Sequence, residues 1–180
     1  MQTEQIRPAA PSLRRARADD AAALADLKLT CFRETFLEDL AVPYPPDDLA
    51  RFISETYVAE RVAAEIADPT HATWVCEAAD GTLLAYAHAG PSKLPHPDMT
   101  PTSAELYQLY ARRDAQGLGL GRQLMSAAFD WLNQAYPGPI WIGVWSENHR
   151  AQAIYSRAGF SKVGDYHFMV GDHRDDEYIF

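Results

Sequence analysis

Several features are scarce or missing in this 180-residue sequence. No apolar run approaches the ~20 residues that a membrane-spanning helix needs, and no internal repeat or low-complexity segment is present. Positive charge is in deficit, with 16 Lys and Arg against 25 Asp and Glu and a net charge of −9. That balance argues against a surface for nucleic-acid phosphates and is compatible with a cationic partner. The length and the 47% hydrophobic share fit one globular domain.

Cysteine is also scarce, and the two thiols, Cys31 and Cys76, have no Cys or His neighbour at metal-ligand spacing. We therefore expect free, buried thiols and no metal. Among residues 1–11, Ile6 is the only bulky aliphatic side chain besides Met1, so the segment lacks the apolar core of a secretory signal. We expect a flexible tail over 1–11, a single domain over 12–180 and a cytoplasmic location.

Apolar periodicity predicts a mixture of strands and helices. Helical spacing begins after Asp19 or Asp20, which can cap the helix, and a proline-rich stretch over 90–102 predicts an exposed loop. The order of elements predicts an α/β (mixed α+β) fold, with helices on both sides of a central mixed sheet. Strands are expected at 13–16, 73–77, 83–89, 105–111, 140–145, 160–170 and 178–180, and helices at 20–32, 46–57, 59–66, 120–136 and 148–158.

A glycine-rich run, Gln116-Gly117-Leu118-Gly119-Leu120-Gly121, stands between a predicted strand and a predicted helix. Glycines permit left-handed dihedrals and leave the backbone open to a ligand, and a helix start adds unpaired N–H groups. This combination favours an anion such as a pyrophosphate, although a purely structural tight turn would use the same residues. The spacing misses the dinucleotide pattern Gly-x-Gly-x-x-Gly, and no Walker lysine follows.

The run resembles the cofactor signature Gln/Arg-x-x-Gly-x-Gly/Ala of the GNAT superfamily of N-acetyltransferases, met here by Gln116, Gly119 and Gly121. A second block, residues 147–160, is similar to the Asn-x-x-Ala-x-x-x-Tyr-x-x-x-Gly-Phe helix of that family. The resemblance implies a mostly antiparallel central sheet of about six to seven strands, and acetyl-CoA as co-substrate. The implied cofactor-binding residues are Leu109, Tyr110, Ala111, Gln116, Gly117, Leu118, Gly119, Leu120, Gly121, Arg122, Asn148 and Tyr155, and the backbone of 109–111 is expected to bulge and bind the pantetheine amides.

Two catalytic roles follow from the same resemblance. Tyr155 would protonate the departing thiolate, which suits a phenol of pKa ~10 facing a thiol of pKa ~8.5, although a core tyrosine is the plainer alternative. Glu105 would accept the proton of the attacking ammonium; it could also bind a second substrate charge, or be a strand-end carboxylate in solvent. Alternation along the strand predicts that Glu105, Tyr107, Leu109 and Ala111 share one face.

Other polar residues carry two interpretations each. Asn148 can bind the cofactor or cap its own helix. Arg112 and Arg113 can reach cofactor phosphates, but a solvated charge pair is favoured, and His149 and Arg150 share that ambiguity. The remaining histidines show no ligand spacing. The aromatic residues Tyr107, Tyr110, Trp141 and Trp145 favour core packing over cation binding.

Residues 105–110, 141–145 and 167–172 also look like the bacterial PaiA-type spermidine/spermine N-acetyltransferases. We therefore expect acetyl transfer to a primary amine of a small substrate, with polyamines first, by direct transfer and without nucleic acid or membrane. Protein N-termini, lysines and amine antibiotics are alternative acceptors within the family, and a non-catalytic acyl-CoA-binding or sensing domain is the alternative class. The strand 178–180 can close the sheet or pair with a neighbour, so a homodimer stays open.

Overall fold

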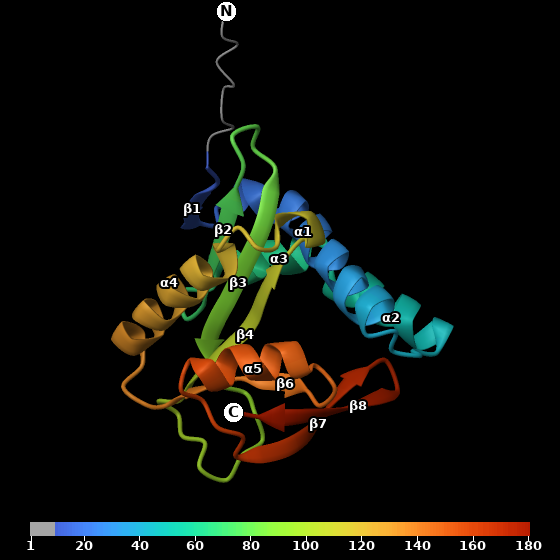
Figure 1. Ribbon diagram of the computed structural model, residues 1–180, viewed down its shortest axis with the longest axis vertical. Coiled ribbons are helices and arrows are strands. Elements are labelled where there is room, and N and C mark those ends of the chain that lie inside the picture. Colours follow the sequence, from blue (N-terminus) through green and yellow to red (C-terminus); the bar gives the residue numbers. More distant parts are fainter. Residues whose placement is uncertain (1–9) are drawn as a thin grey trace, which may run out of the picture.

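The computed structural model describes residues 10–180 (Figure 1). Most of the expected tail, 1–9, lies outside the described residues. Within 10–180 no helix combines the length and the apolar character needed to cross a membrane. Cys31 and Cys76 are buried and free, as expected.

A five-stranded sheet forms the centre, with its strands in the order β1-β2-β3-β4-β5. All pairs are antiparallel except β4 and β5, which run parallel. The bounds are Ser12–Arg15 for β1, Ala72–Glu77 for β2, Leu83–Pro91 for β3, Ala104–Ala111 for β4 and Ile140–Trp141 for β5. Each strand agrees with its predicted segment, apart from the last.

Alternation along β3 divides the core into two layers. Ala85, Ala87 and Ala89 face helix α4 (Leu120–Ala135), whereas Tyr86 faces the helices α1 (Ala21–Phe32) and α3 (Ala59–Ala67). Figure 1 shows α4 on one side of the sheet and α1 and α3 on the other. Small side chains on the α4 face allow the helix to pack closely, since every second strand residue contacts it.

A second sheet has three strands in the order β6-β8-β7, with bounds Gly143–Trp145, His173–Ile179 and Gly164–Val170. The predicted single strand 140–145 is therefore wrong. It breaks at Ile142, whose N–H and C=O both bond to Phe180 rather than to β4. The class of fold is confirmed, but the eight strands found within residues 10–180 lie in two sheets. Because β8 lies between β6 and β7, residues 178–179 pair within their own chain.

Helix α1 continues directly into a π-helical segment, η2 (Arg33–Asp39), and helix α2 (Pro46–Thr56) follows. Aromatic side chains from these elements and from the residues just before and after α2 pack around Phe32, which contacts Phe36, Tyr44, Phe52 and Tyr57. Helix α5 (His149–Arg157) matches its prediction within a residue at each end. The loop after β3 is only partly exposed, because Leu94 and Ser103 are buried.

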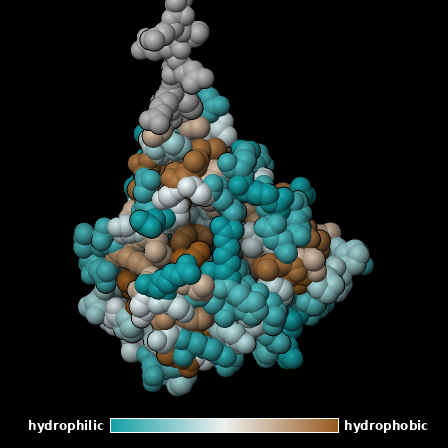
Figure 2. Space-filling model, in the orientation of Figure 1, coloured by the Kyte–Doolittle hydropathy of each residue, from teal (hydrophilic) through white to brown (hydrophobic). Residues whose placement is uncertain are grey.

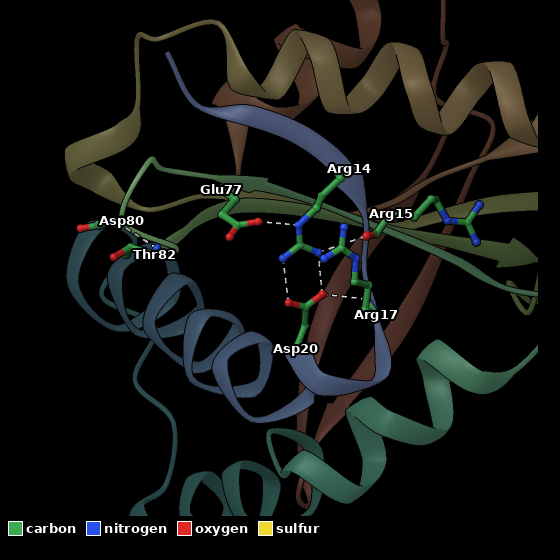
Figure 3. A network of polar contacts seen from close by, with 7 residues as sticks. All are labelled: Arg14, Arg15, Arg17, Asp20, Glu77, Asp80 and Thr82. Carbon is green, nitrogen blue, oxygen red and sulfur yellow. Dashed lines mark hydrogen bonds and ion pairs between the residues drawn. The ribbon is translucent and has the colours of Figure 1, made fainter. Parts of the chain in front are cut away.

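A charged network joins the first strand to its neighbours (Figure 3). The Arg14 guanidinium donates to both oxygens of Asp20, at 2.6 and 2.8 Å, and also to Glu77 of β2. Asp20 precedes α1 but caps none of its amides, so the predicted capping role is wrong; its carboxylate instead accepts from Arg14 and from the Arg17 N–H. The hydrogen bond from Arg14 is the main reason that the pKa of Asp20 lies below its ordinary value.

Candidate active site

The glycine run forms the connection between β4 and α4. Gly117 and Gly119 have φ of +82° and +78°, a region that side chains with a Cβ rarely adopt, and Gly119 immediately precedes the helix. Gly121 has helical dihedrals. A Cβ built at any of the three would meet no protein atom within 4 Å. The first-turn amides of a 16-residue helix therefore face open space, which suits an anion.

The predicted residues of this run do not all face the same way. Gln116, Gly117, Gly121 and Arg122 line a large cavity, whereas Leu118 is 57% exposed and the Leu120 side chain is buried in the core. The Gln116 side chain accepts a hydrogen bond of 2.7 Å from Arg150, so it links the glycine run to α5. Leu120 can take part only through its backbone, because its side chain is buried in the core.

The cavity has a volume of about 1010 Å³ and extends between the two sheets. Beyond the glycine run, its wall is built by β4 and β6, by α5, and by side chains of α1, η2 and the β7–β8 hairpin. On the face drawn in Figure 2, apolar residues lie recessed near the middle and hydrophilic residues surround them. A site of this volume has room for an extended ligand and a second, smaller one.

Strand β4 leaves one edge open to the cavity. It pairs with β5 only at Ala104 and Glu105, and from Leu106 onward that edge has no strand partner among the described residues. The expected bulge over 109–111 is wrong: this stretch pairs regularly with β3, and the extra residue is Tyr107, between the pairs Ala89–Leu106 and His88–Gln108. Leu109, Tyr110 and Ala111 still line the cavity wall.

The bulge also reverses the predicted face pattern. Leu109 and Ala111 pack into the core beneath α4, whereas Glu105 and Tyr107 share the opposite face with Tyr110. An extra residue in one strand shifts every later side chain to the other face. There the Tyr107 ring stacks on His71 and packs at a tilt against His88, at centroid distances of 5.6 and 5.3 Å.

Tyr155 lies on α5, is 8% exposed and lines the cavity, with its ring edge-on to Phe160. Burial raises the pKa of its hydroxyl, so the group is a phenol at neutral pH. Asn148 caps α5, and its Oδ1 accepts the Ala151 N–H at 3.0 Å. The capping interpretation therefore accounts for this oxygen. His149 is exposed at the surface, while Arg150 lines the cavity.

Glu105 is 7% exposed, so the interpretation as a solvated strand-end carboxylate is wrong. Its Oε2 accepts the Lys93 N–H at 2.8 Å and the Ser92 hydroxyl at 3.2 Å. Burial raises the pKa of the carboxyl, and these two hydrogen bonds oppose that rise because they stabilise the charged form. The carboxylate faces the cavity at the start of β4, at the far end of the strand from the glycine run.

Sequence reasoning missed two further carboxylates, both on β8. Asp175 is 5% exposed and accepts the Tyr44 hydroxyl at 2.7 Å, and Glu177 accepts the Tyr166 hydroxyl. Both carboxylates line the cavity. The available signal was strand alternation in Asp175-Asp176-Glu177, which directs the first and third side chains to one face and Asp176 to the other.

The remaining candidates have partners of their own. Arg112 pairs with Asp114 at 2.7 Å, and Arg113 pairs with Glu38 and Asp39 at 2.9 and 2.7 Å. Trp141 packs in a small core cluster with Leu94 and Ile179, and within residues 10–180 no three acidic, His or Cys side chains come together in a metal-binding group. Tyr107, Tyr110 and Trp145 reach the cavity.

A helix start open to an anion, a strand edge without a strand partner among the described residues and a buried tyrosine all lie at one cavity. Residues 29–160 match the acetyltransferase (GNAT) family, and the protein belongs to that family. This family uses acetyl-CoA. The open glycine run fits the pyrophosphate of that molecule, because the three missing Cβ atoms leave its amides accessible.

Two relatives and one solved structure illustrate the similarity. The chain is 26% identical over 147 residues to an uncharacterized N-acetyltransferase of Lactobacillus delbrueckii subsp. lactis, covering 82% of this chain and 84% of the relative. It is 30% identical over 138 residues to the uncharacterized N-acetyltransferase Rv2669 of Mycobacterium tuberculosis, covering 74% and 81%. The PaiA N-acetyltransferase of Thermoplasma acidophilum, solved with coenzyme A, shares the fold at a TM-score of 0.71 and 19% identity, covering 95% and 98%.

Proposed function

We propose that this protein transfers the acetyl group of acetyl-CoA directly to a primary amine of a small, positively charged acceptor, with polyamines as the first candidates. The observation that carries the proposal is a set of three carboxylates in the cavity lining, Glu105, Asp175 and Glu177, which come from strands outside the glycine run. Buried carboxylates attract an ammonium group strongly, because the surrounding dielectric is low. The resemblance of residues 105–110, 141–145 and 167–172 to PaiA-type spermidine/spermine N-acetyltransferases supports the same class of acceptor.

Residues of the glycine run and the open edge of β4 bind and orient the donor. The N–H groups of Gly117, Gly119 and Gly121 bind its pyrophosphate, and Arg122 and Arg150 add positive charge at the same end of the cavity. Backbone groups over 109–111 bind the pantetheine arm. Acetyl-CoA supplies an activated thioester once bound, and holding it in line with an amine provides much of the rate.

Tyr155 and Glu105 act on protons and charge. The buried phenol of Tyr155 donates the proton that the departing sulfur takes. Glu105 supplies a fixed negative charge where the acceptor ammonium enters. Both substrates are held in one cavity, so no covalent enzyme intermediate is needed.

The experiment is a panel of amines assayed by thiol release: spermidine, spermine, putrescine, free amino acids, peptides with free N-termini and an aminoglycoside. We expect turnover with the polyamines and little with the peptides. Tyr155→Phe should slow turnover by a factor of about 10²–10⁴ while acetyl-CoA binding changes little. If the wild type binds acetyl-CoA but acetylates no primary amine, the protein is an acyl-CoA-binding domain and the proposal is wrong; unchanged turnover in Tyr155→Phe would remove only the acid role.

A further inference from the structure

Glu177 occupies the middle strand of the small sheet, where its position is well defined. On β8 it lies between Trp145 of β6 and Tyr166 of β7 in the strand register. The Tyr166 hydroxyl donates to its Oε2, and the side chain lines the cavity. Gly143 leaves the room that this pair requires, since a Cβ there would overlap the Tyr166 hydroxyl and lie 3.2 Å from Glu177 Oε2. The carboxylate is therefore held at one point of the cavity wall.

The groups that act on Glu177 come from four parts of the fold. Glu105 of β4 and Asp175 of β8 contribute negative charge, and the hydroxyls of Tyr166, Tyr44 and Tyr110 are nearby. Burial raises the pKa of Glu177 from 4.5 to about 7, the charges of Asp175 and Glu105 add to the rise, and the hydrogen bond from Tyr166 opposes it.

Glu105 and Glu177 thus differ in what surrounds them. Glu105 accepts two hydrogen bonds, from a backbone N–H and from Ser92, and the Lys93 charge also favours its ionised form. Glu177 accepts one, from a phenol, and faces two other carboxylates. When environments separate the proton affinities of two carboxyls in one site, the pair divides the roles of fixed charge and proton acceptor.

We propose that Glu177 is the general base of the reaction, that Tyr166 positions it, and that Glu105 binds the charge of the acceptor. This assignment rests on the proposed amine acetylation. The acceptor ammonium gives one proton to the Glu177 carboxylate, and its nitrogen then forms the C–N bond while the C–S bond breaks. The sulfur takes the Tyr155 proton, and the second proton lost by nitrogen restores Tyr155. The proton on Glu177 passes to solvent as the one net proton released.

The test is the pH dependence of kcat/KM for the best amine of the panel. In the wild type we expect kcat/KM to fall as pH drops below about 7, which gives the pH profile an acidic limb. Glu177→Gln should remove the limb and lower kcat about 100-fold or more, with the KM for the amine changing less than about threefold. Glu105→Gln should mainly raise that KM, and it should move the limb to lower pH because a neighbouring negative charge is lost.

Two further variants separate this role from a structural one. Tyr166→Phe removes the hydrogen bond that stabilises the ionised carboxylate, so the limb should move to higher pH without disappearing. Asp176→Asn is the matched control, since Asp176 is exposed and paired with His167 on the outer face of the same strand. It should leave kcat, KM and the limb unchanged.

The outcomes distinguish the two proposals. An active wild type whose limb persists in Glu177→Gln, or stays in place in Tyr166→Phe, overturns the assignment of Glu177 and leaves amine acetylation intact. A wild type that acetylates no amine overturns both. If Glu177→Gln does not fold, the opposite shifts in Tyr166→Phe and Glu105→Gln decide the question, because a merely structural Glu177 would produce neither.

Discussion

Gly121→Ala should raise the stability of the protein and lower its affinity for acetyl-CoA. Gly121 has helical dihedrals within α4, and a Cβ there meets no protein atom within 4 Å. Replacing glycine by alanine in a helix is worth about 0.5–1 kcal/mol, and in a domain of this size each kcal/mol moves Tm by ~2–4 °C. The apo protein should therefore melt about 1–4 °C higher.

The same methyl group projects into the cavity where the pyrophosphate is proposed to bind. Displacing the phosphate from the helix amides weakens two or more charge-assisted hydrogen bonds, and we expect acetyl-CoA to bind at least ~10-fold more weakly. Calorimetric titration with acetyl-CoA and thermal unfolding without it measure the two effects separately.

Gly119→Ala is the matched comparison. Its φ of +78° is left-handed, and an alanine there costs about 1–2 kcal/mol, so this variant should lose both affinity and stability. Unchanged acetyl-CoA affinity in Gly121→Ala would contradict the placement of the pyrophosphate. A lower Tm in that variant would show that the helix start is packed more tightly than its open surroundings indicate.

Three further predictions concern stability. Asp20→Asn weakens the hydrogen bonds from Arg14 and should lower the free energy of unfolding by about 2 kcal/mol at pH 7. This loss should shrink as pH falls below about 4, because the pKa of Asp20 is depressed and its carboxylate stabilises the fold only while it is ionised. Urea unfolding of wild type and variant at pH 7 and at pH 3 measures the difference. Glu177→Gln should stabilise the fold by up to about 3 kcal/mol at pH 8 and not at pH 4, because a carboxyl whose pKa rises from 4.5 to about 7 destabilises the folded protein as it ionises. Chemical denaturation between pH 4 and pH 8 measures this. A difference in unfolding free energy between variant and wild type that does not change with pH would refute the idea. Glu65→Ala leaves the buried Lys28 ammonium without its carboxylate partner and should cost about 3 kcal/mol by urea unfolding, whereas a loss below about 1 kcal/mol would mean that water reaches Lys28.

Local patterns were sufficient for the parts of the site that lie close together in the sequence. The glycine run, the strand before it and the helix after it are all set by residues 104–135, and the structure has them at the predicted bounds to within a residue. Asn148 and Tyr155 lie seven residues apart on one helix, and their placement needed only helical periodicity.

Long-range pairing decided the rest. Ile142 has the character of a strand residue, but its two hydrogen bonds go to Phe180, and no local signal identifies that partner. The bulge at Tyr107 is likewise a property of two strands together, so alternation in β4 alone predicted the wrong face for Leu109 and Ala111. Glu177 reaches the cavity only because β8 lies between β6 and β7. The π-helical segment after α1 also carried no signal in the apolar pattern.

The residues that line the two halves of the cavity are distributed differently along the sequence. The glycine run, the open edge of β4, Asn148 and Tyr155 all come from one uninterrupted stretch, 105–155, whereas most of the opposite wall is assembled from α1, η2 and α2 near one end of the chain and the β7–β8 hairpin at the other. Exchanging those outer segments between relatives would therefore change which acceptor is preferred and leave the residues proposed to bind acetyl-CoA unchanged. A chimera that keeps residues 104–158, and with them Glu105, but takes its other segments from a second member of the family should bind an amine through the same carboxylate and prefer the amines that the second member prefers.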